Sequence, residues 1–352
     1  MKTAEKKSIT LSDVAKTAGV TSMTVSRVVN QNGYVSEETR DKVLRVVKDL
    51  NYRRNGLARG LKRQRTDTIG LVLGDIANPF AAELARSIRE ITTQRGYNLF
   101  ICISEHSAKE DVAAFDALAD HQVDGIIVAT RSNCVGDEHL HEMIERGVSV
   151  VSIGRDFHDE NADSVTADAL HGGFQATQHL IDLGHRKIAF IGATLASGKN
   201  LKRLQGYLKG LEANNLPIEE RFITGNSETS DEAPGYSTEK LGYEAMKRLL
   251  VLPKRPTAVF ARNDFTAIGA MNAIKESGLS IPKDISIIGF DDIPTAIHTS
   301  PALTTVRQPT RRQGSLAAEF LLRRIEAKEF VEREEKVLEC ELIVRDSTTN
   351  PE

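Results

Sequence analysis

The 352-residue chain contains only three cysteines, Cys102, Cys134 and Cys340, and they lie far apart in the sequence. None belongs to a C-x-x-C pair, so the pattern favours neither a disulfide framework nor a zinc site. No apolar run approaches the length of a membrane span, and the N-terminus M-K-T-A-E-K-K-S lacks the apolar stretch of a secretory signal. We therefore expect a cytoplasmic protein with no membrane partner, no metal and no other cofactor.

Motifs of catalysis are also missing. The chain has no G-x-S-x-G sequence. The stretch Gly192–Asn200 resembles a phosphate-binding loop, but five residues instead of four separate its glycines, and Asn200 stands where Ser or Thr would hold magnesium. His139 and His141 lie two residues apart on a polar helix without a partner cluster, which is typical of a solvated face. We expect the protein not to be an enzyme.

Charge is distributed unevenly along the chain. Residues 1–65 carry 15 Lys and Arg against 6 Asp and Glu, a net charge of +9, whereas the whole chain carries −3. The remaining residues therefore carry −12. A basic N-terminal head on an acidic body predicts that the head binds a polyanion and that the body does not share this task.

The head begins with two short helices joined by a turn. Thr10 and Asp13 have the spacing of a capping box, Gly19 breaks the first helix, and Thr21 can cap the second. The apolar faces consist of Leu11, Val14, Ala15 and Ala18 in the first helix and of Val25, Val28 and Val29 in the second. The second helix keeps a polar outer face, so we predict a helix-turn-helix that reads the major groove. An ordinary helical hairpin is the alternative.

A third helix completes the head. Ser36 is a good N-cap, and an amphipathic pattern follows until Asn51-Tyr52, formed by Val43, Leu44, Val47 and Leu50. Three helices in about fifty residues predict a small module with a thin core.

From Thr68 onward, short apolar strands alternate with helices. The predicted strands are T-I-G-L-V-L, N-L-F-I-C-I, G-I-I-V-A and V-S-V-V-S-I, followed by K-I-A-F-I-G-A, R-F-I-T-G, T-A-V-F-A and I-S-I-I-G-F. Helices are predicted after Pro79 and around residues 109–121, 137–146, 169–183, 199–214, 238–250 and 264–277. Such alternation indicates right-handed crossovers and parallel sheets covered on both faces. We predict an α/β body of two similar lobes.

The chain resembles the lactose-repressor/galactose-repressor (LacI/GalR) family of bacterial transcription regulators. The likeness rests on T-L-S-D-V-A-K-T-A-G-V-T-S-M-T-V-S-R-V-V-N, on V-S-E-E-T-R-D-K-V and on L-N-Y-R-R-N-G-L-A-R-G-L-K, and it continues to about residue 348. It implies an all-α helix-turn-helix head and a periplasmic-binding-protein-like body of two doubly wound parallel-sheet lobes.

The resemblance also implies a domain plan. We expect the DNA-binding head at residues 1–54, a hinge helix or linker at 55–66, and an effector-binding and dimerisation body at 67–348. The body chain should cross between lobes three times, near Ala167, Pro301 and Glu332. The first lobe then comprises residues 67–166 and 302–331, and the second comprises 167–301 and 332–348.

In this family the first residues of the second helix contact base edges, and here they are Ser22, Met23 and Arg27. Arg27 suits a guanine, and Met23 suits a thymine methyl group. Alternatively, Ser22 contacts phosphate and Met23 is a packing residue. The other DNA-facing candidates are Thr10, Thr21, Thr24, Ser26 and Asn30, of which all but Ser26 are expected to face phosphates.

The basic segment Asn55 to Lys62 is too short to be a stable helix alone. The resemblance implies that it folds on DNA as a hinge helix in the minor groove, with Leu61 wedged between base pairs and Ala58 on the groove floor. Arg59 and Lys62 would lie near phosphates. A plain basic linker is the alternative. Many family members have proline where this chain has Arg54, a change that either loosens the linker or adds a phosphate contact.

Effector candidates are the residues that follow strands, because ligands of doubly wound sheets bind at the carboxyl ends. The resemblance matches Arg203 and Asp291 to a cleft arginine and aspartate that grip the effector, and Phe80 to a position that presents an apolar residue or ring. These groups indicate a site for a small polyol, sugar or base. The candidate set is Asp75, Asn78, Phe80, Arg155, Arg203, Asn263, Asp291 and Gln308, and Asp156, Asp264 and Asp292 also follow strands.

Some of these residues have structural explanations. Asn78 can cap the helix after Pro79, Asp264 is expected to cap the helix that starts F-T-A-I-G-A, and Arg203 with Asp291 can form an interlobe salt bridge. Residues 226–238 are longer and more polar than expected from the family, so no role is transferred to this loop.

Together these features predict a homodimeric repressor whose heads bind a pseudo-palindromic operator. Lobe closure on a small metabolite would order or disorder the hinge helices. The chain ends soon after V-L-E-C-E-L-I-V-R-D-S, which favours a dimer over a tetramer. Four basic residues favour a sugar acid or phosphorylated sugar, but a neutral sugar or nucleobase stays open, as does the sign of the response; they are Arg155, Lys199, Lys202 and Arg203. The rival interpretation is a solute-binding protein or sugar-processing enzyme with a similar body.

Overall fold

The computed structural model describes residues 9–30, 32–52, 65–105, 107–130, 134–155, 157–195, 201–225, 238–327 and 329–351. The chain divides into two compact units, Met1–Thr66 and Asp67–Glu352. Each unit has its own hydrophobic core among these residues. Among the described helices, none combines the length and apolar character needed to cross a membrane.

The described part of the first unit contains three helices, α1 (Leu11–Ala18), α2 (Ser22–Asn30) and α3 (Glu37–Asp49). The predicted capping box is confirmed, because the Thr10 hydroxyl accepts the Asp13 N–H at 3.3 Å and the Asp13 carboxylate accepts the Thr10 N–H at 2.8 Å. Gly19 ends α1 with a φ of 65°. The core of this unit consists of Val14, Ala15, Ala18, Val25, Val28, Val29 and Val43.

The N-termini of α2 and α3 differ in how they are capped. The Thr21 hydroxyl oxygen accepts the Thr24 N–H at 3.2 Å, as predicted. Ser36 occupies the N-cap position of α3, but its hydroxyl donates to Thr39 Oγ1 at 2.9 Å and makes no side-chain bond to a backbone N–H. The cap predicted at Ser36 is therefore right in position and wrong in chemistry.

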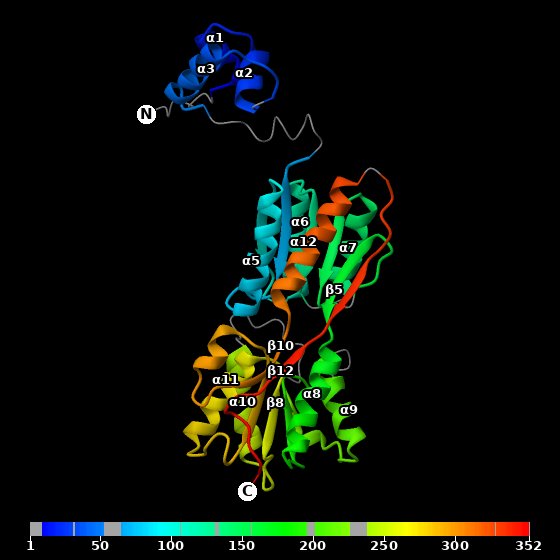
Figure 1. Cartoon of the computed structure of the whole chain (residues 1–352). Coiled ribbons are helices and arrows are strands. Elements are labelled where there is room, and N and C mark those ends of the chain that lie inside the picture. The colour runs from blue at the N-terminus through cyan, green and yellow to red at the C-terminus, as the bar shows by residue number, and fades with distance from the viewer. Residues whose placement is uncertain are drawn as a thin grey trace, which may run out of the picture. The chain divides into compact units, whose positions relative to one another are not determined.

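The body contains two six-stranded sheets, each with helices on both faces (Figure 1). The first sheet has the order β11-β5-β4-β3-β1-β2, and all neighbours are parallel. Its strands are β1 (Thr68–Leu73), β2 (Asn98–Ile103), β3 (Gly125–Ala129), β4 (Ser149–Ile153), β5 (Ala162–Ala167) and β11 (Glu335–Leu338). On one face pack α5 (Pro79–Gln94) and α12 (Thr310–Glu326), and on the other α6 (Ala108–Asp120) and α7 (Cys134–Glu145). We call this sheet and its helices lobe 1.

Lobe 2 has the strand order β12-β10-β9-β8-β6-β7, which is parallel except for the antiparallel pair β10 and β12. Its strands are β6 (Ile188–Ile191), β7 (Ile223–Thr224), β8 (Ala258–Ala261), β9 (Ser286–Asp291), β10 (Thr304–Arg307) and β12 (Glu341–Ile343). Helices α10 (Thr238–Leu250) and α11 (Asp264–Glu276) cover one face, and α8 (Ala169–Asp182) and α9 (Lys202–Ala213) cover the other. Two short 3-10 helices span Glu220–Phe222 and Pro294–His298. The predicted class of two doubly wound sheets is confirmed.

Two of the three predicted crossings between the sheets are wrong. The first follows β5 at Ala167, as expected. However, β10 pairs with β9 in the second sheet, and β11 pairs with β5 in the first. The later crossings therefore follow Arg307 and Leu338, instead of lying near Pro301 and Glu332. Residues 304–307 belong to lobe 2 and residues 335–338 to lobe 1.

Buried contacts explain both corrections. Val306 of β10 is fully buried in the lobe 2 core. Before β11, the Glu334 N–H donates to the buried Asp163 carboxylate of β5 at 2.7 Å, and Arg324 of α12 donates to the same carboxylate at 2.6 and 2.8 Å. Since these partners lie far apart in the sequence, composition near the crossings did not indicate them.

Candidate functional site

The outer surface of α2 carries the predicted DNA-facing side chains. Ser22, Ser26 and Asn30 follow each other at intervals of four residues, and Asn30 Nδ2 donates to Ser26 Oγ at 3.1 Å. Met23 and Arg27 form the neighbouring row. Met23 is 66% exposed, so the alternative in which Met23 packs into the core of this unit is wrong.

The threonine candidates lie at the N-termini of α1 and α2. The Thr10 hydroxyl donates to Asp13 Oδ2 at 2.7 Å, and the hydroxyls of Thr21 and Thr24 are 2.9 Å apart. Helix N-termini favour phosphate groups, because their backbone N–H groups and dipoles point towards the anion. The hinge candidates and two cleft candidates lie outside the described residues; they are Asn55, Ala58, Arg59, Leu61, Lys62, Asp156 and Lys199.

In lobe 2, three of the effector candidates come together. Arg203 of α9 places Nη2 at 3.2 Å from Asp291 Oδ1, at the end of β9. Gln308, which follows β10, donates from Nε2 to the same oxygen at 2.6 Å. Arg203 also donates from Nη1 to the Arg262 carbonyl at 2.5 Å, and its guanidinium lies 4.0 Å from the centre of the Phe290 ring. This cluster lies at the carboxyl ends of the strands, where doubly wound sheets bind ligands.

The salt bridge between Arg203 and Asp291 lies within one lobe. Both residues belong to lobe 2, so the interlobe alternative is wrong. Burial raises the pKa of Asp291, and the nearby Arg203 guanidinium opposes that rise. Arg203 and Gln308 both donate to Oδ1, and Oδ2 accepts from none of the residues that the structure describes.

Asp291 and Asp292 form a strained turn at the end of β9. Their φ angles are 116° and 56°, and a non-glycine residue in such a conformation costs of the order of 1–3 kcal/mol. Asp292 is held by Arg307 at 2.7 Å and by Arg345 at 2.5 Å. The surrounding structure therefore fixes the turn that carries the Asp291 carboxylate.

The start of α11 differs from the prediction. Asn263, not Asp264, caps the helix, because its side-chain oxygen accepts the Thr266 N–H at 2.8 Å. Asp264 is fully buried and accepts the Thr305 hydroxyl at 2.5 Å and the Ile293 N–H at 2.8 Å. The expected cap at Asp264 is therefore wrong by one residue.

The loop after β1 approaches from lobe 1. Asn78 caps α5 by accepting the Phe80 N–H at 3.0 Å, which confirms its structural explanation. Asp75 accepts the Ala77 N–H at 2.8 Å. The Phe80 ring packs against the core of lobe 1 and against the lobe 2 core on the α10 and α11 face, whereas Phe290 of the Arg203 cluster belongs to the core on the α8 and α9 face.

Arg155 does not join this cluster. Its side chain is fully buried in lobe 1, donates to Asp137 of α7 at 2.9 and 2.5 Å and to Thr130 at 2.6 Å, and lies 3.7 Å from Asp111 of α6. These contacts tie α6 and α7 to the ends of β3 and β4.

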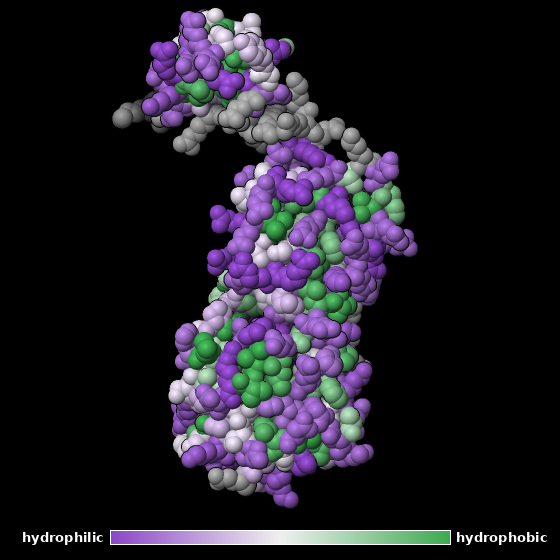
Figure 2. Space-filling model, in the orientation of Figure 1, coloured by the Kyte–Doolittle hydropathy of each residue, from purple (hydrophilic) through white to green (hydrophobic). Residues whose placement is uncertain are grey.

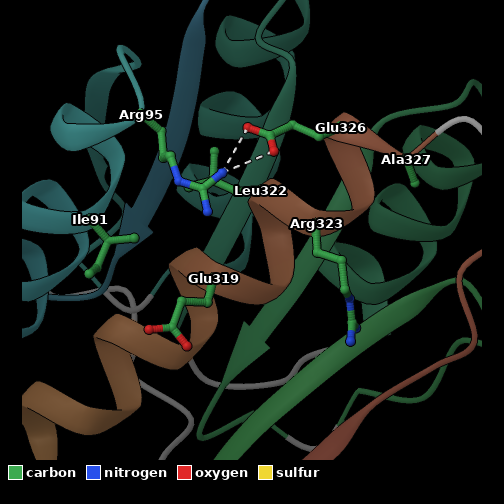
Figure 3. A pocket seen from close by; sticks show the side chains of 7 residues that line it. All are labelled: Ile91, Arg95, Glu319, Leu322, Arg323, Glu326 and Ala327. Carbon is green, nitrogen blue, oxygen red and sulfur yellow. Dashed lines mark hydrogen bonds and ion pairs between the residues drawn. The ribbon is translucent and has the colours of Figure 1, made fainter.

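A separate groove of about 420 Å³ lies between the last turns of α5 and α12 (Figure 3). Arg95 spans it to Glu326 at 3.1 Å. Phe80 is in the first turn of α5, whereas Ile91 and Arg95 lie at its far end. The groove is therefore remote from the Arg203 cluster, and the sequence prediction placed no residue in it.

Two contributors to the cluster were missed from the sequence. Arg262 acts through its carbonyl group, for which the residue type gives no signal. Phe290 was hidden inside an apolar strand, although its position directly before Asp291 places it beside the strand end.

A helix-turn-helix unit, joined in one chain to two doubly wound lobes with a polar cluster at the strand ends, defines a ligand-responsive DNA-binding regulator. Comparison with known proteins agrees. Residues 10–55 match the family described as "Bacterial regulatory proteins, lacI family", and residues 177–348 match the "Periplasmic binding protein-like domain".

Relatives extend this match over nearly the whole chain. The HTH-type transcriptional repressor PurR of Histophilus somni (strain 129Pt) is 37% identical over 340 residues, which cover 96% of this chain and 98% of PurR. The lac repressor dimer bound to operator and the anti-inducer ONPF has a TM-score of 0.80 at 29% identity, with 97% and 100% of the two chains covered. The complex of the transcriptional regulator CelR with cellobiose has a TM-score of 0.70 at 33% identity, with 96% and 99% covered.

The chain belongs to the lacI family of bacterial regulatory proteins. It is a DNA-binding transcriptional repressor regulated by a small-molecule effector. Its relatives are transcriptional regulators, which argues against the rival interpretation as an enzyme.

Proposed function

We propose that the protein is a cytoplasmic, non-catalytic homodimer that binds an operator through α2 and is switched by a neutral carbohydrate bound between its lobes. The observation that carries the effector proposal is the cluster of Arg203, Asp291 and Gln308 at the carboxyl ends of the lobe 2 strands, where the Arg203 guanidinium lies 4.0 Å from the centre of the Phe290 ring. Carboxylate and amide groups beside an apolar ring suit a ligand with many hydroxyl groups.

The charges favour a neutral effector over a sugar acid or sugar phosphate. Arg203 is matched by Asp291, and Arg155 is matched inside lobe 1 by Asp137 and Asp111. The sequence-based preference for an anion counted both arginines as cationic groups of the cleft. With each paired to a carboxylate, neither arginine carries unbalanced positive charge with which to hold an anion; of the two lysines in that count, Lys202 is exposed and Lys199 lies outside the described residues.

A thermal-shift panel tests this proposal, since a ligand that binds only the native state raises the melting temperature. The panel contains D-ribose and cellobiose as neutral sugars, gluconate, glucose 6-phosphate and a purine base. At least one neutral sugar should stabilise the full-length protein, and Arg203→Ala should abolish the shift. The matched control is Arg221→Ala, because Arg221 also pairs with a carboxylate, Glu219, and stacks on a ring, Phe222. Stabilisation by the anions alone contradicts the proposal.

For DNA, we propose that Ser22, Met23 and Arg27 read bases and that the threonines and Asn30 position the protein on phosphates. Arg27→Ala should then lower discrimination at one base pair by about 1–3 kcal/mol. Arg45→Ala of α3, an exposed arginine outside α2, should leave the sequence preference unchanged. Binding should also weaken steeply as salt rises, because phosphate contacts release counterions. Operator binding that does not weaken as salt rises would contradict this part of the proposal.

The hinge proposal concerns Leu61. If two Leu61 side chains kink the operator, Leu61→Ala should weaken specific binding and reduce bending of the DNA. Bending can be measured by fluorescence energy transfer between the ends of an operator duplex. Unchanged bending favours the plain linker.

The edge of the first sheet supports dimerisation. β2 is an edge strand, and its Phe100 and Ile101 side chains are 46% and 42% exposed. The face of the body shown in Figure 2 is mostly hydrophilic, with apolar side chains gathered in small areas. An exposed apolar edge is typical of a surface covered by a partner. Phe100→Glu should shift sedimentation towards the monomer, whereas Val251→Glu, at an 82% exposed apolar residue of lobe 2, should not.

A further inference from the structure

The buried carboxylate of Asp264 has no role in the functions described above. Its side chain is inaccessible to solvent, so it cannot touch an effector in this conformation. Its two oxygens have different partners: Oδ2 accepts the Ile293 N–H at 2.8 Å, and Oδ1 accepts the Thr305 hydroxyl at 2.5 Å. A buried carboxyl group is costly to place, and here its two directed hydrogen bonds hold two separate segments of the chain.

The surrounding chain is shaped around this carboxylate. Gly289 of β9 lies directly against Asp264 Oδ1, and a Cβ atom at position 289 would collide with that oxygen. Gly289 also pairs with Thr305 across the two strands. A glycine in β9, a threonine in β10 and the first residue of α11 therefore meet at one point.

Both hydrogen bonds flank the effector cluster. Ile293 follows the strained pair Asp291 and Asp292 by one residue, and Thr305 precedes Gln308 by three. Asp264 is therefore hydrogen-bonded to the chain that follows Asp291 and to the strand that leads to Gln308. Its removal frees the turn whose positive φ angles the surrounding structure must maintain.

We propose that Asp264 is a positioning residue of the effector site, and that its buried carboxylate holds the β9–β10 region in the conformation that presents Asp291 and Gln308 to the effector. The inference rests on the effector site proposed above. Burial and the neighbouring charge of Asp291 raise the pKa of Asp264 well above its usual range, so a neutral group of the same shape is a suitable replacement. Asparagine is that replacement, because its amide oxygen can still accept the Ile293 N–H.

The test measures hydrogen exchange of the full-length protein by mass spectrometry over residues 289–308. Asp264→Ala should speed exchange at Ile293 and in the surrounding peptides by roughly tenfold, because it removes two buried hydrogen bonds. Asp264→Asn should restore most of the protection. Thr305→Val, a milder change that removes only one bond, should give a partial effect even if Asp264→Ala fails to fold.

The matched control is Thr266→Val. Thr266 is also fully buried in the first turn of α11, but its hydroxyl has no hydrogen-bond partner among the described residues. Exchange in this variant should equal that of the wild type. The proposal is overturned if Asp264→Ala and Thr305→Val leave exchange unchanged, if Thr266→Val speeds it equally, or if Asp264→Asn is no better than Asp264→Ala.

A second readout separates this inference from the proposed function. Any neutral sugar that stabilises the wild type should lose most of its thermal shift with Asp264→Ala and keep it with Asp264→Asn. If ribose, cellobiose and every other ligand of the panel leave the wild type unchanged, the effector proposal fails, and the exchange measurement still decides whether Asp264 holds the turn.

Discussion

Removing the Asp163 side chain should destabilise the body strongly, because this carboxylate is the centre of a buried ionic network. Asp163 is inaccessible to solvent and accepts from Arg324, whose side chain is only 8% exposed, at 2.6 and 2.8 Å. It also accepts from Arg323 at 3.1 Å and from the Glu334 N–H at 2.7 Å. Asp163→Ala leaves the Arg324 guanidinium buried without its counter-ion.

The expected cost is about 3–5 kcal/mol, which is typical of breaking a buried pair from one side. We count only the Arg324 pair at full strength, because Arg323 is 36% exposed and its charge is screened by solvent. For a domain of this size the cost corresponds to a fall in Tm of roughly 6–10 °C. Urea unfolding and calorimetry of the full-length protein at pH 7 would measure it.

Two comparison variants sharpen the experiment. Glu326→Ala breaks the ion pair with Arg95, whose side chains are 41% and 60% exposed, and should cost only about 0–1 kcal/mol. The double variant Asp163→Leu with Arg324→Leu removes both buried charges and should recover part of the loss. If Asp163→Ala costs no more than Glu326→Ala, the buried network does not anchor the chain before β11, and the reasoning is refuted.

Three further changes have defined expectations. Burial lowers the pKa of His185 below the 6.5 of an unfolded histidine, so the unfolded chain binds protons first and the body should lose stability as pH falls through 6.5. His185→Asn should make the urea midpoint depend less on pH between 7.5 and 5.5, and His298→Asn, at an exposed histidine, should leave that dependence unchanged. Gly269→Ala should lower the free energy of unfolding by about 1–3 kcal/mol, because the added Cβ would collide with the Glu239 carbonyl where α11 crosses α10. Asn272→Ala, at an exposed position of the same helix, should change it by no more than about 0.5 kcal/mol in chemical denaturation. Thr10→Ala should lower the stability of the N-terminal unit by about 1 kcal/mol in a thermal melt, because the capping box is lost. The control is Thr17→Ala, since the Thr17 hydroxyl donates to the Asp13 carbonyl within the same helix. Equal losses in the two variants would contradict the capping argument.

Local patterns sufficed where the determining contacts are local. The apolar faces of α1 and α2, the caps at Thr10 and Thr21 and most of the strands depend on residues within a few positions of each other. The strand β5 was not predicted, because A-D-S-V-T-A is polar and reads as a loop. Its Asp163 is accommodated in a sheet by arginines some 160 residues further along the chain, and no window of sequence contains both.

The cluster of Arg203, Asp291 and Gln308 shows the same contrast between local and distant determinants. Its side chains were predictable from their places after strands, but the hydrogen bonds that distinguish a ligand-facing group from a structural one were not. Asn263 and Asp264 are neighbours with similar side chains, and both fit a helix cap by residue type. In the structure, Asn263 caps the helix, and Asp264 accepts hydrogen bonds from the Ile293 N–H and the Thr305 hydroxyl.

The different roles of Asn263 and Asp264 follow from the position of Gly289 and not from the sequence of α11. Because position 289 has no Cβ, β9 leaves space for a carboxylate directly beneath the turn at Asp291, and the side chain that fills this space must come from the residue after the cap. A side chain at Asn263 that accepts the Thr266 N–H is already engaged at the helix end. The identity of the residue that supports Asp291 is therefore set by a glycine in β9, twenty-five residues along the chain.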